Sequence, residues 1–155
     1  PTREMGFLPG TAEEKLLPFI TPYISICEDL FSYKGAYQQL VEQDILNFHS
    51  TSFIRGQTFD NSVIIVDECS NLTFHELDSV ITRVGVDTRI VFCGDYYQSD
   101  FLKQSDKNGL LKFLEIIELM KNFSVVEFGW GDIVRGDLCR DYIMTKEMYE
   151  QGLWK

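Results

Sequence analysis

The 155-residue sequence has few residues of the types that build structural metal sites or disulfide frameworks. It contains four cysteines and two histidines, and no Cys-x-x-Cys pair. The wide spacing of Cys27, Cys69, Cys93 and Cys139 argues against a zinc site and against a set of disulfides in a domain of this size. We therefore interpret the four cysteines as reduced packing residues and expect a cytoplasmic protein.

Long apolar runs are also missing. No segment approaches the roughly 20 apolar residues of a membrane span, and the first residues do not form the pattern of a secretory signal. The 24 acidic residues outnumber the 14 basic ones, which gives a formal net charge of −10. This charge argues against nucleic-acid binding through the overall field and leaves only local basic pairs, Arg83 with Arg89 and Arg135 with Arg140.

The length and the 45% hydrophobic content fit one globular domain with a real core. Strand-like apolar runs alternate with apolar residues at helical spacing, which predicts βαβ units and a mainly parallel sheet flanked by helices. Pro18 and Pro22 should make the first helix short, kinked or broken. We expect strands at 63–66, 89–93 and 124–128, and helices beginning at Thr11, near Tyr37, and at Thr73, Leu110 and Ile133.

The run Val63–Val66 leads directly into Asp67 and Glu68. Four consecutive apolar β-formers predict a strand buried on both faces, and the two acids then fall at its carboxyl end, where open α/β sheets bind ligands. In nucleoside-triphosphate hydrolases this pattern is the Walker B strand, whose first acid holds Mg²⁺ and whose second can polarise water. The alternative is a core strand that ends in solvated carboxylates.

A second apolar run ends in Gly94 and Asp95, and Gln98 follows three residues later. If the two strands are parallel neighbours, these polar groups and the first pair of acids lie at one edge of the sheet. Carboxylates are suitable ligands for Mg²⁺, and an amide can bond both water and phosphate. The two runs together predict a magnesium–phosphate site.

Eight short motifs make the sequence recognisable. They are Gly6–Gly10, Glu14-Lys15, Arg55–Thr58, Ile65–Glu68 with Asn71, Thr82–Gly85, Gly94-Asp95 with Gln98 and Asp100, Gly109-Leu110, and Asp132–Arg135. Together and in this order they strongly resemble the PhoH-like, phosphate-starvation-inducible ATPase family of bacteria and their phages. The resemblance spans roughly residues 1–143.

The resemblance implies a RecA-like P-loop NTPase core that uses ATP and Mg²⁺ and is related to superfamily-one helicases. On this basis Asp67 is the magnesium ligand and Glu68 the general base, and the motif of Gly94, Asp95 and Gln98 is similar to a helicase sensor. Arg135 is similar to an arginine finger that acts on a neighbouring subunit, which implies a homo-oligomer. Arg55 lies in a motif that can contact phosphate or RNA or can brace its loop, so RNA or single-stranded nucleic acid is an expected partner.

The departures from the family are specific. No GxxxxGK[ST] loop occurs in the chain, so we expect an N-terminally truncated domain that lacks the Walker A segment and is inactive by itself. We assign residues 1–145 to the C-terminal part of the ATPase domain and residues 146–155 to a terminal tail. Gly136 stands where the family usually has His, which weakens the assignment of a finger to Arg135.

Two other classes of function stay open at this point. Asp67, Glu68, Asp95 and Asp100 could form the carboxylate cluster of a metal-dependent nuclease, and the chain could instead be a non-catalytic oligomerisation module. For Arg83 we favour a structural role, because a cation stabilises the C-terminal end of a helix. The location expected from the resemblance is the cytoplasm of a bacterial cell or of a phage-infected host.

Overall fold

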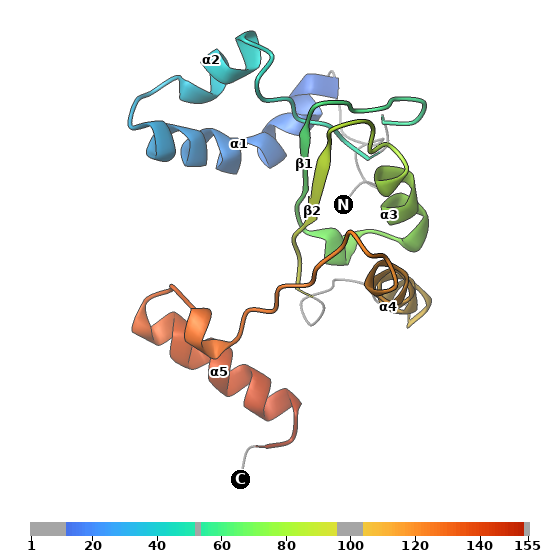
Figure 1. The fold of residues 1–155 in the computed structure, drawn as a ribbon. Coiled ribbons are helices and arrows are strands. Elements are labelled where there is room, and N and C mark those ends of the chain that lie inside the picture. The colour runs from blue at the N-terminus through green and yellow to red at the C-terminus, as the bar shows by residue number, and fades with distance from the viewer. Residues whose placement is uncertain (1–11, 52–53, 96–103, 154–155) are drawn as a thin grey trace. The chain divides into compact units, whose positions relative to one another are not determined.

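The computed structural model describes residues 12–51, 54–95 and 104–153 of the chain (Figure 1). The chain divides after Glu115 into two compact units. The first unit holds the α/β part, and the second holds a loop region and the last helix. The elements are α1 (Ala12–Phe31), α2 (Ala36–Glu42), β1 (Val63–Val66), η2 (Cys69–Asn71), α3 (Phe74–Ile81), β2 (Arg89–Phe92), α4 (Gln104–Glu118), η4 (Trp130–Asp132) and α5 (Asp137–Glu150).

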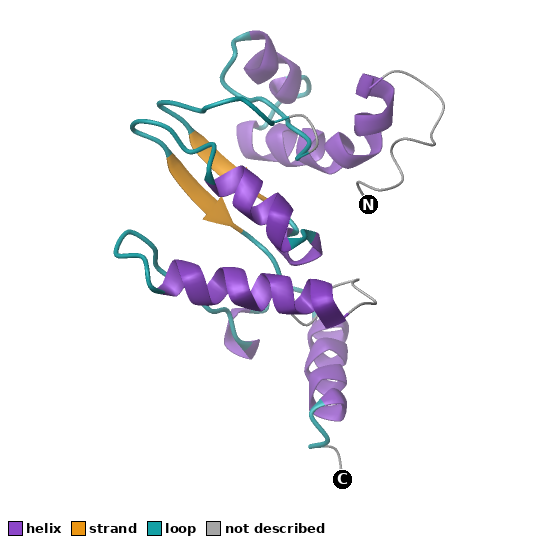
Figure 2. Cartoon of the chain, turned by 90° about the vertical axis from the view of Figure 1, so that its right-hand side faces the viewer, coloured by secondary structure: helices purple, strands orange, loops and turns teal. Residues whose placement is uncertain are grey.

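The sheet of the first unit consists of β1 and β2, which pair in parallel. Val63 lies opposite Arg89, and Val66 lies opposite Phe92. Helix α3 connects the two strands, so the predicted βαβ unit is confirmed. The start of α3 is defined by a capping box that Thr73 and Glu76 form. Figure 2 shows α3 beside the two strands.

The core of this unit lies on one face of the sheet. Val66 is buried against Ile54 and Val80, so β1 and α3 share one cluster. Phe92 of β2 meets Phe113 of α4 edge to face, with the ring centroids 5.0 Å apart. Burying side chains of this size contributes about 1.5–3 kcal/mol each to folding. The partly buried apolar residues packed around the cluster are Phe59, Ile64, Cys69, Leu72, Ile90 and Phe92.

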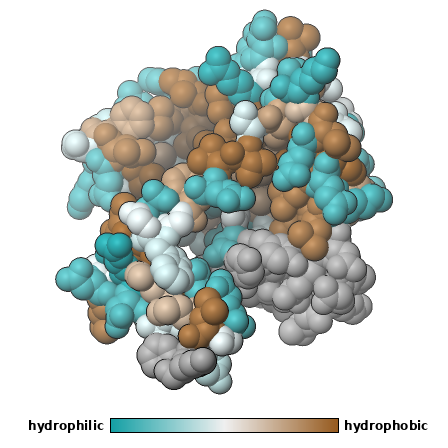
Figure 3. All heavy atoms as spheres, turned by 60° about the horizontal axis from the view of Figure 1, so that its bottom comes forward, coloured by the Kyte–Doolittle hydropathy of each residue, from teal (hydrophilic) through white to brown (hydrophobic). Residues whose placement is uncertain are grey.

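The prediction that β1 is buried on both faces is wrong for this structure. Its residues alternate, and Val63 and Ile65 are 65% and 68% exposed. The alternation follows from the pleat, which directs successive side chains to opposite faces, and only one face is packed here. Figure 3 shows apolar side chains reaching the surface in patches between polar ones.

Helix α1 continues through both Pro18 and Pro22. Each proline removes one backbone donor, and Figures 1 and 2 both show the axis of the helix bending. The hydroxyl of Thr21 donates to the carbonyl oxygen of Leu17 at 2.8 Å. Of the three outcomes that the sequence allowed, the kinked helix is the one observed.

Three other elements differ from the prediction. Residues 124–128 form no strand, and Val126 and Phe128 are 74% and 82% exposed. A strand needs a hydrogen-bonded neighbour, and in the described part of the chain this segment pairs with none. Helix α4 begins at Gln104, ahead of the predicted start at Leu110, and α5 begins at Asp137, after the predicted start at Ile133. Within the described ranges, no helix has both the length and the apolar character needed to cross a membrane.

Candidate functional site

Two backbone hydrogen bonds continue the pairing of β1 and β2 past the carboxyl ends of the strands. The amide of Cys93 donates to the carbonyl oxygen of Val66 at 2.8 Å, and the amide of Cys69 donates to the carbonyl oxygen of Cys93 at 2.9 Å. The segment that carries Asp67 and Glu68 is therefore bonded to the residue that precedes Gly94. Because the strands are parallel, Asp67 and Glu68 lie at the same edge of the sheet as Gly94 and Asp95, the described part of the second motif.

Gly94 allows this close approach. A Cβ atom built at Gly94 would lie 2.8 Å from the Sγ of Cys69 and 2.9 Å from the amide nitrogen of Ser70. Both distances are shorter than atoms of these kinds tolerate, so any larger residue would push the second motif away from the first. The glycine is required by contact with the neighbouring backbone.

The carboxylate of Asp67 is held on both oxygens. Its Oδ1 accepts a hydrogen bond from the amide of Glu68 at 3.0 Å, and its Oδ2 accepts one from the hydroxyl of Tyr23. Asp67 is also exposed to solvent. A carboxylate has about four lone-pair positions, so two accepted bonds fix its orientation and leave positions open toward solvent.

Tyr23 comes from α1 and is the site residue that the sequence analysis missed. Its ring contacts that of Phe48, with centroids 5.6 Å apart and planes inclined by 54°. Burial, the hydrogen bond to Asp67 and the nearby carboxylates raise the pKa of Tyr23 to about 12, so its hydroxyl remains a donor at neutral pH. No sequence pattern marks the residue, because it lies 44 positions from Asp67 and on another element.

Glu68 has an unusual backbone conformation, with φ 52° and ψ 38°. This left-handed region costs an ordinary residue roughly 1–2 kcal/mol. Ser32, Asp44, Asn61 and Asp87 also have a positive φ, and the short Asn and Asp side chains tolerate it better than Glu. The conformation turns the chain sharply out of β1 and into η2, and it leaves Glu68 exposed at the end of the strand.

The cysteines of this edge differ from each other. Cys69 packs against the core, and burial, followed by the proximity of Cys93, raises the pKa of its thiol to about 11. It is a packing residue, as predicted. Cys93 is exposed, as is Cys139 in the second unit, so the packing interpretation is wrong for these two residues. All four cysteines are free thiols.

The acids at this edge suit a Mg²⁺ ion that takes only part of its coordination shell from the protein and the rest from phosphate and water. Among the described residues, no group of three or more His, Cys, Asp or Glu is arranged to hold a metal ion. Mg²⁺ in nucleotide sites commonly takes one or two carboxylates and completes its shell with phosphate and water. The oriented carboxylate of Asp67 suits that mode. The nuclease alternative also needs Asp100, which lies outside the described residues.

Arg55 and Arg83 lie around the loop 54–58. The Nη2 of Arg55 is 3.4 Å from the Nε2 of His75, in the first turn of α3. Arg83 donates from Nε to the carbonyl oxygen of Ser79 at 3.2 Å and from Nη1 to that of Gln57 at 3.4 Å. The structural role expected for Arg83 is confirmed, since it binds a carbonyl near the end of α3 and also holds the loop that carries Arg55.

The remaining predicted site residues are not part of this geometry. Gln98 lies outside the described residues, as do the motif Gly6–Gly10 and Asp100. Arg135 belongs to the second unit and lies in a bend before α5, whereas the sequence placed it on a helix beginning at Ile133. Its neighbour Gly136 is extended and serves as the N-cap of α5, which is why the helix begins only at Asp137.

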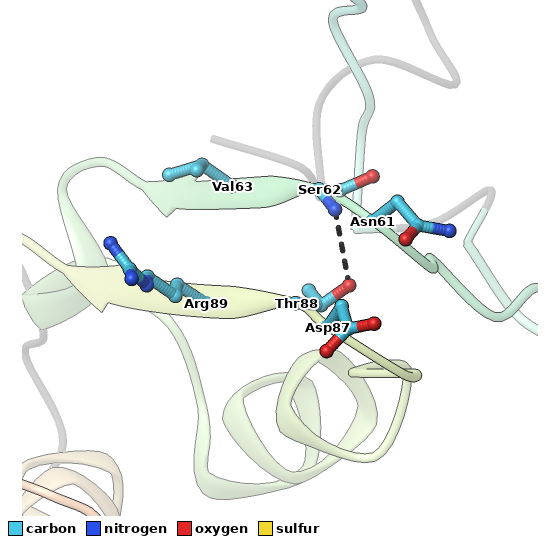
Figure 4. A pocket seen from close by; sticks show the side chains of 6 residues that line it. All are labelled: Asn61, Ser62, Val63, Asp87, Thr88 and Arg89. Atoms are coloured by element: carbon cyan, nitrogen blue, oxygen red, sulfur yellow. Dashed lines mark hydrogen bonds between the residues drawn. The ribbon is translucent and has the colours of Figure 1, made fainter.

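A pocket of about 490 Å³ lies at the opposite ends of the same strands (Figure 4). In its lining, the amide of Ser62 donates to the hydroxyl of Thr88 at 3.2 Å, and the amide of Arg89 donates to the carbonyl oxygen of Ser62 at 2.9 Å. Its position before Val63 and Arg89 puts it at the amino ends of β1 and β2, away from the acids. The lining residues are Asn61, Ser62, Val63, Asp87, Thr88 and Arg89.

The sequence of the chain is similar to those of proteins from several bacteria. Residues 2–149 match the sequence model of a family described as PhoH-like protein. The chain is 33% identical over 138 residues to "Protein PhoH" of Escherichia coli K12, covering 88% of this chain and 39% of that protein. It is 30% identical over 134 residues to a "PhoH-like protein" of Bacillus subtilis, covering 86% and 41%. A "PhoH-like protein" of Mycobacterium leprae is 29% identical over 147 residues, covering 95% and 42%.

Proposed function

Because the chain belongs to the PhoH-like protein family, we propose that it is part of a Mg²⁺-dependent ATPase with a RecA-like P-loop core. The chain spans about two fifths of the length of the curated relatives it matches. The observation that carries the proposal is the bonded junction at the ends of β1 and β2, where the amide of Cys69 meets the carbonyl of Cys93. That junction brings two acidic strand-end motifs together, as an ATPase site requires.

In this proposal each residue of the edge has a defined task. Asp67 contributes a metal ligand through its oriented carboxylate, and Glu68 accepts a proton from the water that attacks the γ-phosphate. Asp95 and Gln98, with Gly94, form the part that responds to the bound nucleotide. Bound Mg²⁺ would neutralise charge that develops on the phosphates.

The phosphates themselves need a cradle that these 155 residues do not supply. The chain contains no GxxxxGK[ST] sequence, the loop whose amides and lysine hold the β- and γ-phosphates. We therefore propose that the complete protein provides such a loop and that the 155-residue chain alone binds Mg-ATP weakly or not at all.

Two further assignments belong to the complete protein. We propose that Arg135 acts on the γ-phosphate held by a neighbouring copy, which requires a homo-oligomer. We also propose that ATP hydrolysis is coupled to RNA or single-stranded nucleic acid, with Arg55 contacting phosphate, in the cytoplasm of a bacterial cell or phage-infected host. With a net charge of −10, any such contact must be made by local cations.

Replacement of Glu68 by Gln tests the catalytic assignment. The experiment uses the longest polypeptide whose reading frame includes this chain. Its Mg²⁺-dependent release of phosphate from ATP is measured. Loss of a general base should lower kcat by about 10²–10⁴-fold. Nucleotide affinity should persist. Glu42→Gln is the matched control, because Glu42 is an exposed acid at the end of α2.

Hydrolysis at an unchanged rate in Glu68→Gln would show that Glu68 is not the base. The nuclease alternative is tested by incubating the chain with single-stranded RNA and Mn²⁺ without nucleotide, since cleavage under these conditions is expected only for a carboxylate-cluster nuclease. A folded protein that binds no nucleotide would instead indicate a non-catalytic module.

A further inference from the structure

Tyr23 makes a contact that none of the family motifs accounts for. It lies in the second half of α1, one residue after Pro22, and its hydroxyl donates to the Oδ2 of Asp67. The other oxygen of the same carboxylate accepts from the amide of Glu68. The proposed metal ligand is thus held from two directions, by its own backbone turn and by a helix distant in sequence.

This arrangement fixes the plane of the carboxylate while leaving it able to bind a cation. Each oxygen accepts one hydrogen bond and retains a further lone-pair position. Asp67 is solvent-exposed, so those positions are accessible. A free aspartate could rotate about its side-chain bonds, and binding a metal would then require that freedom to be lost. A carboxylate already held in place avoids that loss.

The phenol is itself held in position. Its ring packs at 54° against that of Phe48, with the centroids 5.6 Å apart. Only the hydroxyl reaches Asp67, because the ring is engaged by Phe48. Removing the oxygen atom alone should therefore change the hydrogen bond to Asp67 without changing the packing of the ring.

We infer that Tyr23 is a positioning residue that orients the carboxylate of Asp67 for a divalent cation. The inference rests on the proposed function, in which Asp67 is the metal ligand. Residues that bond to metal ligands commonly change metal affinity by about 10–100-fold when they are replaced. Tyr23 acts in the same way, through its hydrogen bond to Asp67.

The test measures metal binding rather than catalysis. The longest polypeptide encoded in frame with this chain is titrated with Mn²⁺ in the presence of ADP, and free Mn²⁺ is followed by electron paramagnetic resonance. Tyr23→Phe should weaken Mn²⁺ binding about tenfold. Tyr33→Phe is the matched control, because the Tyr33 hydroxyl donates to the Oε1 of Gln39. It loses a hydrogen bond of the same kind at another position and should bind Mn²⁺ normally.

A third variant, Asp67→Asn, separates the inference from the proposed function. It should abolish specific Mn²⁺ binding. If Asp67→Asn leaves binding unchanged, or the unaltered protein binds no Mn²⁺, the metal site itself is wrong and the role of Tyr23 fails with it. If Asp67→Asn loses binding and Tyr23→Phe equals the unaltered protein, only the inference about Tyr23 is wrong. Tighter binding in Tyr23→Phe would overturn it as well, since the phenol would then compete with the metal.

Discussion

Single atoms decide the geometry at the ends of the two strands. One side-chain hydroxyl and one backbone amide hold the carboxylate of Asp67. One missing Cβ lets Gly94 lie against Cys69 and Ser70. Glu68 adopts a strained backbone conformation, which turns the chain at the end of β1. Each of these is a local feature with a cost or constraint of its own, and together they put the acids at an accessible edge.

Gly94 provides a prediction at the scale of the residue. Gly94→Ala should destabilise the fold by about 1–3 kcal/mol, because the added methyl group overlaps the Sγ of Cys69 and the amide of Ser70. Urea denaturation followed by circular dichroism measures the change. Gly131→Ala is the control, since a Cβ there meets nothing within 4 Å. Equal stability of Gly94→Ala and the unaltered chain would contradict the close packing of the two motifs.

At the scale of the element, local hydrogen bonds define the β1–α3–β2 unit. Thr73 and Glu76 cap α3 reciprocally: the amide of Thr73 donates to the Oε2 of Glu76 at 2.8 Å, and the amide of Glu76 donates to the hydroxyl of Thr73 at 3.4 Å. The cap fixes where the helix begins and therefore how the chain returns to start β2. The segment 124–128 has similar apolar residues but no neighbouring strand among those described, so it stays irregular.

The cap gives a second prediction. Thr73→Ala removes the side-chain acceptor of the Glu76 amide and should lower the free energy of unfolding by about 1 kcal/mol. Thermal and urea denaturation provide the measurement. Ser79→Ala in the same helix should be neutral or slightly stabilising, because alanine has the higher helix propensity. If both variants lose stability equally, the capping box is not what stabilises the start of α3.

At the scale of the whole molecule, the net charge and the exposed apolar surface act in opposite directions. Val63, Ile65 and Leu138 are among the large apolar side chains that reach the surface. The formal charge of −10 at pH 7 keeps copies of the chain apart by repulsion. With a sequence pI of about 4.6, that repulsion vanishes in mildly acidic solution.

This balance predicts the solubility of the chain. The amount that remains in solution should be lowest near pH 4.6 and should rise steadily toward pH 7, as the carboxylates ionise and the net charge grows. Precipitation by polyethylene glycol at a series of pH values measures it. Added salt should narrow the difference because it screens the repulsion. A solubility that is the same at both pH values would show that charge does not limit association.

The sequence by itself determined the parts that depend on local patterns. Capping residues marked α3, apolar runs marked β1 and β2, and ordered motifs indicated the family that the comparison then showed. These signals can be read from the sequence because periodicity and hydrogen bonding between near neighbours do not depend on the rest of the fold. The parallel arrangement of the strands also followed, since a helix between two strands allows it.

Only the tertiary structure decided which distant groups meet. The bond from Tyr23 to Asp67 joins residues 44 positions apart, and nothing in either local sequence encodes it. Whether Val63 and Ile65 are buried, and whether 124–128 becomes a strand, likewise depends on what packs beside them. The physical reason is that burial and sheet pairing are made between segments, and their outcome is fixed by the neighbour as much as by the residue. The acids could thus be found from the sequence, and the hydroxyl that holds one of them could not.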